Sequence, residues 1–388
     1  MKQIFTIIFS LLLVCGASQA QTAQDDSKPF FRTIFKSSDK KKETVTITMR
    51  DGSVYTGEVR RKRPHGNGSV LYANGDKYSG TFLDGYRHGS GIYEYKNGDR
   101  YEGSYKENGR HGAGVLLFAD GRKYDGSWVD DRMQGYGRLD YPNGDYYVGA
   151  WVQGKRAGSG TYIYASGATY TGEWRDDRYD GVGTFIWNDN CRYVGEWKSG
   201  QRSGSGVFVS PVGDNYEGMW AHNVCEGQGQ CRYADGALYE GEFKDNMWHG
   251  AGRYVAADST VYEGSFKEGK RNGAGAMLFP NGDVYEGEWK DGLRSGKGVY
   301  KWANGDVYDG YWEDDAMNGA GVLRTADGRR YTGGFVEGLE HGAGVAVDAD
   351  GTRYEGVFVE GQRNGVFIIK DADGNVVREC EYNLGIMD

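Results

Sequence analysis

The chain has 388 residues, of which 65 are Gly, 30 are Tyr and only 5 are Pro, and its formal net charge is -9. So little Pro excludes a collagen or a Pro/Gly linker, and the 14% aromatic content argues against intrinsic disorder. Hydrophobic residues make up 38%, too few for a single globular core of this length. Abundant Gly and aromatic residues, spread evenly, are typical of a repeat array.

Residues 1–20 have the pattern of a secretory signal peptide. A positive charge near the start precedes the apolar run Ile4–Val14, and small residues precede a predicted cleavage between Ala20 and Gln21. The run is about half of the ~20 residues that a membrane-spanning helix needs. We therefore expect export to the periplasm, the cell surface or the medium.

A Tyr-x-Gly motif recurs every 23 residues, fourteen times without insertion or deletion, from Tyr55 to Tyr354. With this tyrosine as position 0, Gly occupies positions +2 and +11 of every unit and position +13 of all but the last. Position +4 is aromatic in thirteen units, and position +17 is often aromatic. So strict a period predicts a repeat architecture. In two central units the repeat positions are Tyr170, Gly172, Trp174, Gly181, Gly183, Tyr193, Gly195, Trp197, Gly204 and Gly206.

Each unit reads as a β-hairpin. Positions 0, +2 and +4 alternate along a strand and share one face, and Gly between two rings leaves room for the rings over bare backbone. We expect a first turn over +5 to +10 and a return strand over about +12 to +18. This register would place the +13 glycine opposite the +4 ring, and the +17 aromatic opposite the tyrosine. Asn-Gly or Asp-Gly pairs at +19 and +20 predict the second turn.

A single hairpin cannot bury its aromatic face alone, so the units must stack. The sequence predicts an all-β protein, an elongated, twisted single-layer antiparallel sheet of 28 strands that spans roughly 130 Å at ~4.8 Å per strand. Residues 21–42 match no unit and are predicted to form a flexible basic leader. Residues 43–54 form an N-terminal half-repeat cap, residues 55–365 the array, and residues 366–388 a C-terminal capping hairpin.

The units resemble the MORN (membrane occupation and recognition nexus) repeat. The resemblance is carried by units such as Tyr285–Gly292 followed by Gly296-Lys297-Gly298, and it covers about residues 44–376. It implies an extended, twisted rod of stacked hairpins that acts as an interaction scaffold or an oligomerisation module. Binding to phospholipid head groups is a further function proposed for the family.

No residue stands out from the periodic background as a catalytic or cofactor-binding group, so we expect neither an enzyme nor a bound cofactor or metal. The turn aspartates lack the spacing of calcium loops, and the Gly-x-Gly pairs lack a surrounding βαβ unit. A histidine ladder of metal ligands is one interpretation of position +10, and a solvent-facing turn is the favoured one, because other units place Gln, Ala, Asp, Ser or Asn there. These histidines are His65, His88, His111, His249 and His341.

Cysteines give a second open question. Cys225 and Cys231 lie in one unit, close enough in sequence to bridge a turn, and export would permit a disulfide. Most other units have no cysteine at these positions, so the bridged and the free state both stay open.

Charge is distributed unevenly. Residues 28–63 carry eleven basic and four acidic side chains, whereas residues 64–388 carry 34 basic and 49 acidic ones, a net charge of -15. An acidic array is a poor nucleic-acid binder. The basic end is either an anionic-surface contact or a solvated region that discourages edge pairing. Its candidate contacts are Lys40, Lys41, Lys42, Arg60, Arg61, Lys62 and Arg63.

These patterns favour a non-catalytic exported scaffold, a rod for protein–protein interaction whose partners bind on the ring-rich face or in the groove made by the twist. The first alternative is a phospholipid or membrane-surface binder that acts through the basic N-terminal end, with weak binding expected. The second is a regulatory subunit of a separately encoded enzyme. Homo-oligomerisation is compatible with each of them.

Overall fold

The computed structural model describes residues 44–387. The predicted signal peptide, the predicted leader and Lys40, Lys41 and Lys42 lie outside the described residues. The described residues form 31 β-strands and no helix. The strands are β1 Thr44–Thr48, β2 Val54–Arg60, β3 Arg63–Leu71, β4 Lys77–Leu83, β5 Tyr86–Glu94, β6 Arg100–Lys106, β7 Gly109–Leu117, β8 Lys123–Val129, β9 Arg132–Asp140, β10 Tyr146–Val152, β11 Lys155–Ile163, β12 Thr169–Arg175, β13 Arg178–Ile186, β14 Arg192–Lys198, β15 Gln201–Val209, β16 Asn215–Ala221, β17 Val224–Arg232, β18 Leu238–Lys244, β19 Met247–Val255, β20 Val261–Lys267, β21 Lys270–Leu278, β22 Val284–Lys290, β23 Leu293–Lys301, β24 Val307–Glu313, β25 Ala316–Arg324, β26 Arg330–Val336, β27 Leu339–Val347, β28 Arg353–Val359, β29 Gln362–Lys370, β30 Val376–Asn383 and β31 Ile386–Met387.

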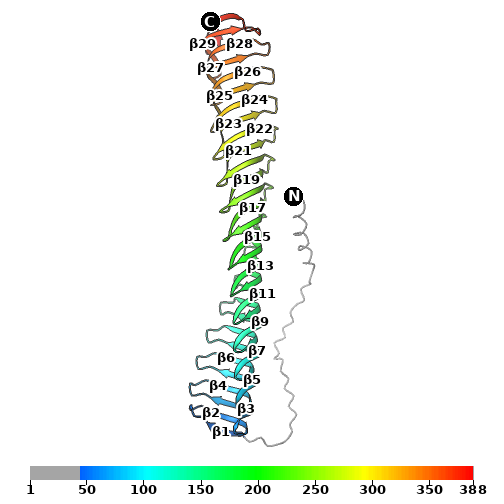
Figure 1. Cartoon of the computed structure of the whole chain (residues 1–388), viewed down its shortest axis with the longest axis vertical. Helices are drawn as coiled ribbons and strands as arrows, with labels where there is room; N and C mark the ends of the chain where they lie inside the picture. Colours follow the sequence, from blue (N-terminus) through cyan, green and yellow to red (C-terminus); the bar gives the residue numbers. More distant parts are fainter. Residues whose placement is uncertain (1–43, 388) are drawn as a thin grey trace. The chain divides into compact units, whose positions relative to one another are not determined.

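Every strand pairs antiparallel with the strands that precede and follow it in the chain. The hairpins therefore follow one another in chain order along one open sheet, from β1 to β31 (Figure 1). The fourteen units supply β2 to β29, which are the 28 predicted strands. The prediction of an all-β antiparallel sheet of stacked hairpins is confirmed.

The two strands of a unit are joined by a tight turn. In the unit of Tyr193, β14 covers positions -1 to +5 and β15 covers positions +8 to +16. Ser199 and Gly200 connect them with φ angles of 52° and 87°. Two successive positive φ angles are the signature of a type I′ turn, whose twist matches that of the flanking strands. The first turn thus occupies only +6 and +7, and the wider turn expected over +5 to +10 is wrong.

The register within a unit also differs from the expected one. Gly206 at +13 faces Gly195 at +2, and Phe208 at +15 faces Tyr193. Position +17 lies beyond the return strand, where it opens the second turn, so the expected pairing of +17 with the tyrosine is wrong by two residues.

The short turn causes the difference, and a bulge in the return strand partly offsets it. β14 passes from Gly195 to Trp197 while β15 passes from Gly206 to Arg202, so β15 contains two more residues over this stretch. Gly204 at +11 lies in the bulge with a φ of 62°. The +11 glycine has a φ between 56° and 108° in all fourteen units. The +11 glycine is therefore required for its positive φ angle, whereas the glycines at +2 and +13 are required because the tyrosine ring leaves no room for a side chain.

A continuous row of aromatic rings forms the centre of the core. Tyr193 packs edge-on against Trp197 of its own unit at 5.2 Å and against Trp220 of the next unit at 5.3 Å between ring centroids. The same contacts, at 4.9 to 5.5 Å, continue without a break from Tyr55 to Tyr382. We call this row the ring ladder. Each edge-to-face pair contributes about 0.5–1.5 kcal/mol beyond the area it buries.

The two ends of the array replace the repeat glycines. Phe367 occupies position +13 of the last unit and is fully buried, with its ring over Gly356. The Phe367 ring extends the ring ladder to Tyr382 in β30. At the other end Val45 in β1 faces Gly57, at the place that a +13 glycine would take. Side chains at these two places mark the terminal strands as caps.

Candidate protein-binding face

The ring ladder is covered by side chains from positions +9, +15 and +17, which pack against it. Those at +17 are half-buried, as are most at +9, whereas +15 is buried in seven units and half-buried in the others. We call the side of the sheet that carries these residues the ladder face. The aromatic residues at +17 are half-buried in nine units, and so present part of each ring to solvent. They are Tyr72, Tyr95, Phe118, Tyr141, Tyr164, Trp187, Tyr233, Phe279 and Trp302.

Arginine at +9 contacts both a ring and a turn residue of the next unit, an arrangement that we call the arginine clamp. The guanidinium carbon of Arg202 lies 4.1 Å from the ring centroid of Trp220 in the next unit. Its Nη2 donates to the carbonyl oxygen of Asn223 at 2.8 Å, and the Asn223 Oδ1 accepts from the Arg202 backbone N–H at 2.8 Å. Burial lowers the pKa of Arg202, but a guanidinium stays charged in proteins. Such a partly desolvated cation–π contact contributes about 1–2 kcal/mol.

The same clamp recurs along the array, with Asp in place of Asn in some units. Arg110, Arg156 and Arg294 each bond Oδ1 and the carbonyl of an aspartate at +7 of the next unit. Sequence reasoning missed this contact. Its signal was present, because Asn or Asp follows most of the +9 arginines by 21 residues.

A second row of rings lies on the ladder face. Ring-centroid distances of 4.5 to 6.0 Å link six half-buried residues from positions +15 and +17 of consecutive units. We call this row the aromatic stripe. It consists of Tyr141, Tyr162, Tyr164, Phe185, Trp187 and Phe208. After Phe208 the stripe ends, because position +17 of that unit is Ser210.

Aspartates at +21 fix the stripe to the second turns. Tyr162 donates its hydroxyl to Asp145 Oδ2 at 2.8 Å, and Asp145 Oδ1 accepts from the backbone N–H of Ala165 at 2.8 Å. The Ala165 backbone bond, followed by the Tyr162 hydroxyl, lowers the pKa of Asp145. The carboxylate thus joins one unit to the next and holds the Tyr162 ring in place.

The basic residues that the sequence singled out lie at the first hairpin. Arg61 and Lys62 are the two residues of the β2–β3 turn, with φ angles of 52° and 64°. Arg60 ends β2 and forms an ion pair with Asp84 at 2.8 Å, while Arg63 begins β3 and is exposed. The structure thus places all four at the first hairpin of the array, and Arg60 is paired with Asp84.

The two cysteines of one unit lie on the same strand. In β17, Cys225 faces Trp220 and Cys231 faces Tyr216, which are four residues apart on β16. All four cysteines among the described residues are free thiols. Burial raises the pKa of Cys225 to about 11, which makes its thiol a poor nucleophile at neutral pH.

The histidines at +10 lie in the return strands and are half-buried, so the expected solvent-facing turn is wrong for this position. The cause is the short turn, after which the return strand begins at +8 and includes +10. His65 Nδ1 lies 3.3 Å from Asp84 Oδ1. Within residues 44–387, no group of three or more His, Cys, Asp or Glu side chains is arranged to hold a metal ion.

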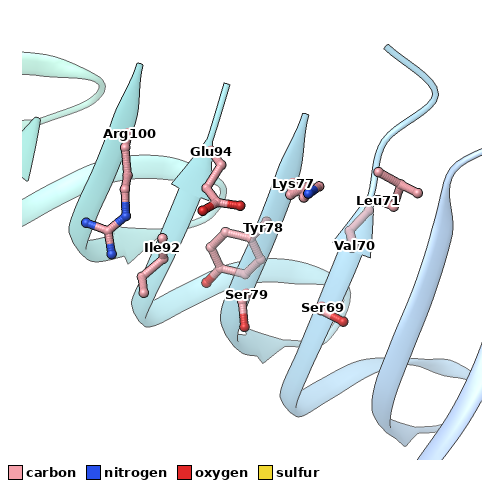
Figure 2. Close-up of a pocket in the computed structure, with 9 residues that line it drawn as sticks. All are labelled: Ser69, Val70, Leu71, Lys77, Tyr78, Ser79, Ile92, Glu94 and Arg100. Carbon is pink, nitrogen blue, oxygen red and sulfur yellow. The ribbon is translucent and has the colours of Figure 1, made fainter. Parts of the chain in front are cut away.

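The other face of the sheet has a shallow recess of about 330 Å³ near the first units (Figure 2). Most of its side chains come from positions -1, +1, +14 and +16, which alternate with the ring positions along the strands. Glu94 faces both Lys77 and Arg100 in the strand register, so opposite charges lie side by side. The lining residues are Ser69, Val70, Leu71, Lys77, Tyr78, Ser79, Ile92, Glu94 and Arg100.

Among solved structures, three similar chains differ strongly in sequence from this one. The TCP domain of SAS-4 from Drosophila melanogaster, in complex with a proline-rich motif of Ana2, is 15% identical over 49% of this chain and 97% of that domain, with a TM-score of 0.26. The TCP10 domain of Danio rerio CPAP is 11% identical over 88% and 100%, with a TM-score of 0.12. A streptogramin B lyase is 13% identical over 81% and 90%, with a TM-score of 0.13. TM-scores this low say nothing about the function of this chain.

No curated protein matches the sequence. Within residues 44–387, no helix is long and apolar enough to cross a membrane. The model of the MORN repeat matches the chain fourteen times, at residues 55–77, 78–100, 101–121, 124–146, 147–169, 170–192, 193–215, 216–238, 239–261, 262–284, 285–307, 308–329, 331–353 and 354–366. These matches coincide with the fourteen hairpins and cover most of the chain, which therefore belongs to the MORN repeat family.

Proposed function

We propose that this MORN repeat protein is a non-catalytic scaffold that binds protein partners through its ladder face. The observation that carries the proposal is the unbroken aromatic stripe from Tyr141 to Phe208, flanked by the half-buried arginines Arg156 and Arg202. Tyr, Trp and Arg are the residues that most often dominate the binding energy of protein interfaces. The +9 arginines, the +15 rings and the +17 rings place all three kinds on one face.

The rigidity of the face also supports binding. Trp174 Nε1 donates to the carbonyl of Gly160 at 3.2 Å, and the Arg156 guanidinium lies 4.5 Å from the Trp174 ring centroid. These contacts fix the buried Trp174 ring, against which the half-buried rings of the face pack, and they join two adjacent units. A surface that is already ordered loses little conformational entropy when it binds, so more of the contact energy appears as affinity.

We further propose that the protein acts outside the cytoplasm, on the basis of the signal-peptide pattern in residues 1–20. Its partners would then be envelope or extracellular proteins. Regulation of a separately encoded enzyme would be one use of such a scaffold.

Site-specific photo-crosslinking tests the proposal. A benzophenone amino acid replaces Tyr164 on the ladder face, and a matched variant carries it in place of Val194 on the other face of neighbouring strands. In the native cell envelope, we expect a discrete protein adduct from the Tyr164 position and none from Val194. Adducts from Val194 alone, equal adducts from both positions, or no adduct from either would contradict the proposal.

A further inference from the structure

The aromatic stripe has a period of its own. Tyr141, Tyr164 and Trp187 occupy position +17 of three consecutive units, and each unit contributes two strands. At ~4.7–4.9 Å per strand, successive +17 rings are offset by about 9.4–9.8 Å along the array. A polyproline II helix rises ~3.1 Å per residue with three residues per turn, or about 9.3 Å per turn. One turn of such a helix therefore matches one unit of the array.

The turns beside the stripe carry charge of one sign. Position +17 opens the second turn of each unit, so these turns lie next to the stripe rings. Three of these turns begin at the stripe residues Tyr141, Tyr164 and Trp187, and the fourth begins two residues after Phe208. They span residues 141–145, 164–168, 187–191 and 210–214. They contain Asp145, Asp189 and Asp214 and no lysine or arginine. A ligand that lies along the stripe therefore meets an acidic border at the second turns, which favours basic residues on that side. Of the two arginines that flank the stripe, Arg156 is already paired with Asp177, and both stack on rings of the ring ladder.

We propose that the aromatic stripe binds a basic, proline-rich segment of a partner protein in the polyproline II conformation. The proposal rests on the proposed function and specifies the chemistry of its partner. Prolines at every third residue pack on the successive +17 rings. Lysines or arginines between the prolines face the border aspartates. Aromatic-lined surfaces are the recurring way in which proteins recognise this conformation, because it is pre-formed and costs little entropy.

Other peptide conformations fit the stripe less well. β15 and its neighbours are paired on both sides, so an added strand finds no free edge beside the stripe. An α-helix repeats every ~5.4 Å along its axis, which does not match a period of about 9.4–9.8 Å.

Peptide binding to the chain from residue 21 to residue 388 tests the proposal. The probes are fluorescent peptides of about twelve residues, and anisotropy is measured at physiological salt. One repeats Pro-Pro-Lys, a second has the same composition with its prolines out of the three-residue period, and a third replaces every Pro with Gly or Ser. We expect the first to bind at least ~10-fold more tightly than the second and the third. Equal binding of all three peptides would show simple charge attraction and overturn the proposal.

Variants locate the site. Trp187→Ala and Tyr164→Ala should weaken binding of the Pro-Pro-Lys peptide at least ~10-fold, with an unchanged circular dichroism spectrum. Trp302→Ala is the matched control, because Trp302 also occupies +17 but lies outside the stripe, and its affinity should stay unchanged. Asp189→Asn should weaken binding at low salt more than at high salt. Unchanged affinity in both stripe variants would overturn the assignment.

The two proposals fail in different ways. If the Tyr164 crosslinker captures a protein but no proline-rich peptide binds, the scaffold function stands and the polyproline II assignment is wrong. If soluble β-linked oligosaccharides bind the stripe instead, with the same loss in Trp187→Ala, the stripe is a glycan site and both proposals are wrong.

Discussion

The hydroxyl of Tyr193 lies 2.3 Å from the place that a Cβ atom on Gly206 would take. The hydroxyl also donates to the carbonyl oxygen of Glu196 at 3.0 Å, so the ring cannot move aside without losing a hydrogen bond. The +13 glycine is present because the tyrosine of its own unit fills the space of a side chain. Where Phe367 replaces this glycine, its own ring fills that space.

Gly195→Val should therefore destabilise the central units. Its Cβ would lie 2.5 Å from the Gly206 Cα and 2.5 Å from the Tyr193 hydroxyl, and the backbone contact cannot be relieved by a rotamer change. We expect a cost of about 3 kcal/mol, the upper end for overpacking. Hydrogen exchange of β14 and β15, with loss of protection spreading to the adjacent units, measures it.

Gly200→Ala is the control for this substitution. Gly200 has a φ of 87° and nothing within 4 Å of its Cβ direction, so alanine there meets backbone strain without a clash. Its cost should be about 1–2 kcal/mol. If the Gly195 and Gly200 variants lost equal protection, space for the Tyr193 ring would not be the role of Gly195.

The sequence was enough to predict the hairpin, the unit count and a ring over the +2 glycine, but the ring over the +13 glycine is the tyrosine of its own unit and not the expected +4 ring. The repeat of Tyr193, Gly195 and Trp197 is direct evidence of a strand whose rings share a face. The register was not predictable in the same way, because Gly204 and Gly206 look alike in sequence although one serves a bulge and the other a close approach. The bulge adds two residues to the return strand, so every cross-strand pair on the side of the bulge away from the first turn is shifted by two residues.

The ladder face was harder to predict for a different reason. Its contacts join residues of neighbouring units, as Arg202 joins Trp220 and Asn223, whereas the repeat pattern emphasises positions within one unit. The +17 rings are half-buried at the start of the second turn, beyond the return strand, and sequence spacing alone did not place them there.

A second prediction concerns an ion pair with exchanged charges. Glu340 occupies position +9, which is an arginine in other units such as Arg202 in the unit of Tyr193. Arg329 occupies position +21, which is an aspartate in other units such as Asp145 in the unit of Tyr124. The N–O distances between Arg329 and Glu340 are 2.6 and 2.9 Å, and the Glu340 side chain is only 9% exposed. Arg329→Ala should cost about 3 kcal/mol, because it leaves a buried carboxylate without its cation. Thermal unfolding measures the loss.

Restoring the charge pattern of the other units should rescue the fold. The double variant Arg329→Asp with Glu340→Arg should regain most of the stability lost in either single variant, and a double-mutant cycle measures this coupling. Additive losses in the double variant would mean that the two charges do not stabilise each other.

Alkaline pH should unfold the array. Burial raises the pKa of Tyr262, Tyr308 and Tyr331 to about 12 each, above the ordinary value of ~10. Between these values the folded chain keeps protons that the unfolded chain has released. The stability from these tyrosines is thus fully present below about pH 10 and is lost as the pH rises through the folded pKa of about 12. Tyrosinate absorbance should rise in step with loss of the strand signal in circular dichroism. Ionisation of nearly all tyrosines near pH ~10 with an unchanged strand signal would disprove this linkage.

Membrane binding should be weak and confined to the basic end. The net charge of -15 on residues 64–388 repels anionic bilayers, whereas Arg61 and Lys62 lie on an exposed turn. In liposome flotation with anionic lipids, the chain from residue 21 should bind weakly and lose binding at high salt. A chain that starts at Thr44 with Arg60, Arg61, Lys62 and Arg63 changed to Ser should not bind. Tight flotation of this Ser variant at high salt would instead place a lipid site on the repeat surface.

The central claim is that fourteen hairpins stack continuously into one rod that presents the ladder face along its length. Small-angle X-ray scattering of the chain from residue 21 to residue 388 tests it most directly. The 28 strands of the units, at ~4.8 Å per strand, predict a maximum dimension above ~100 Å and a cross-section typical of a thin rod. A compact, near-spherical particle of this mass would contradict the architecture and, with it, the proposed binding face.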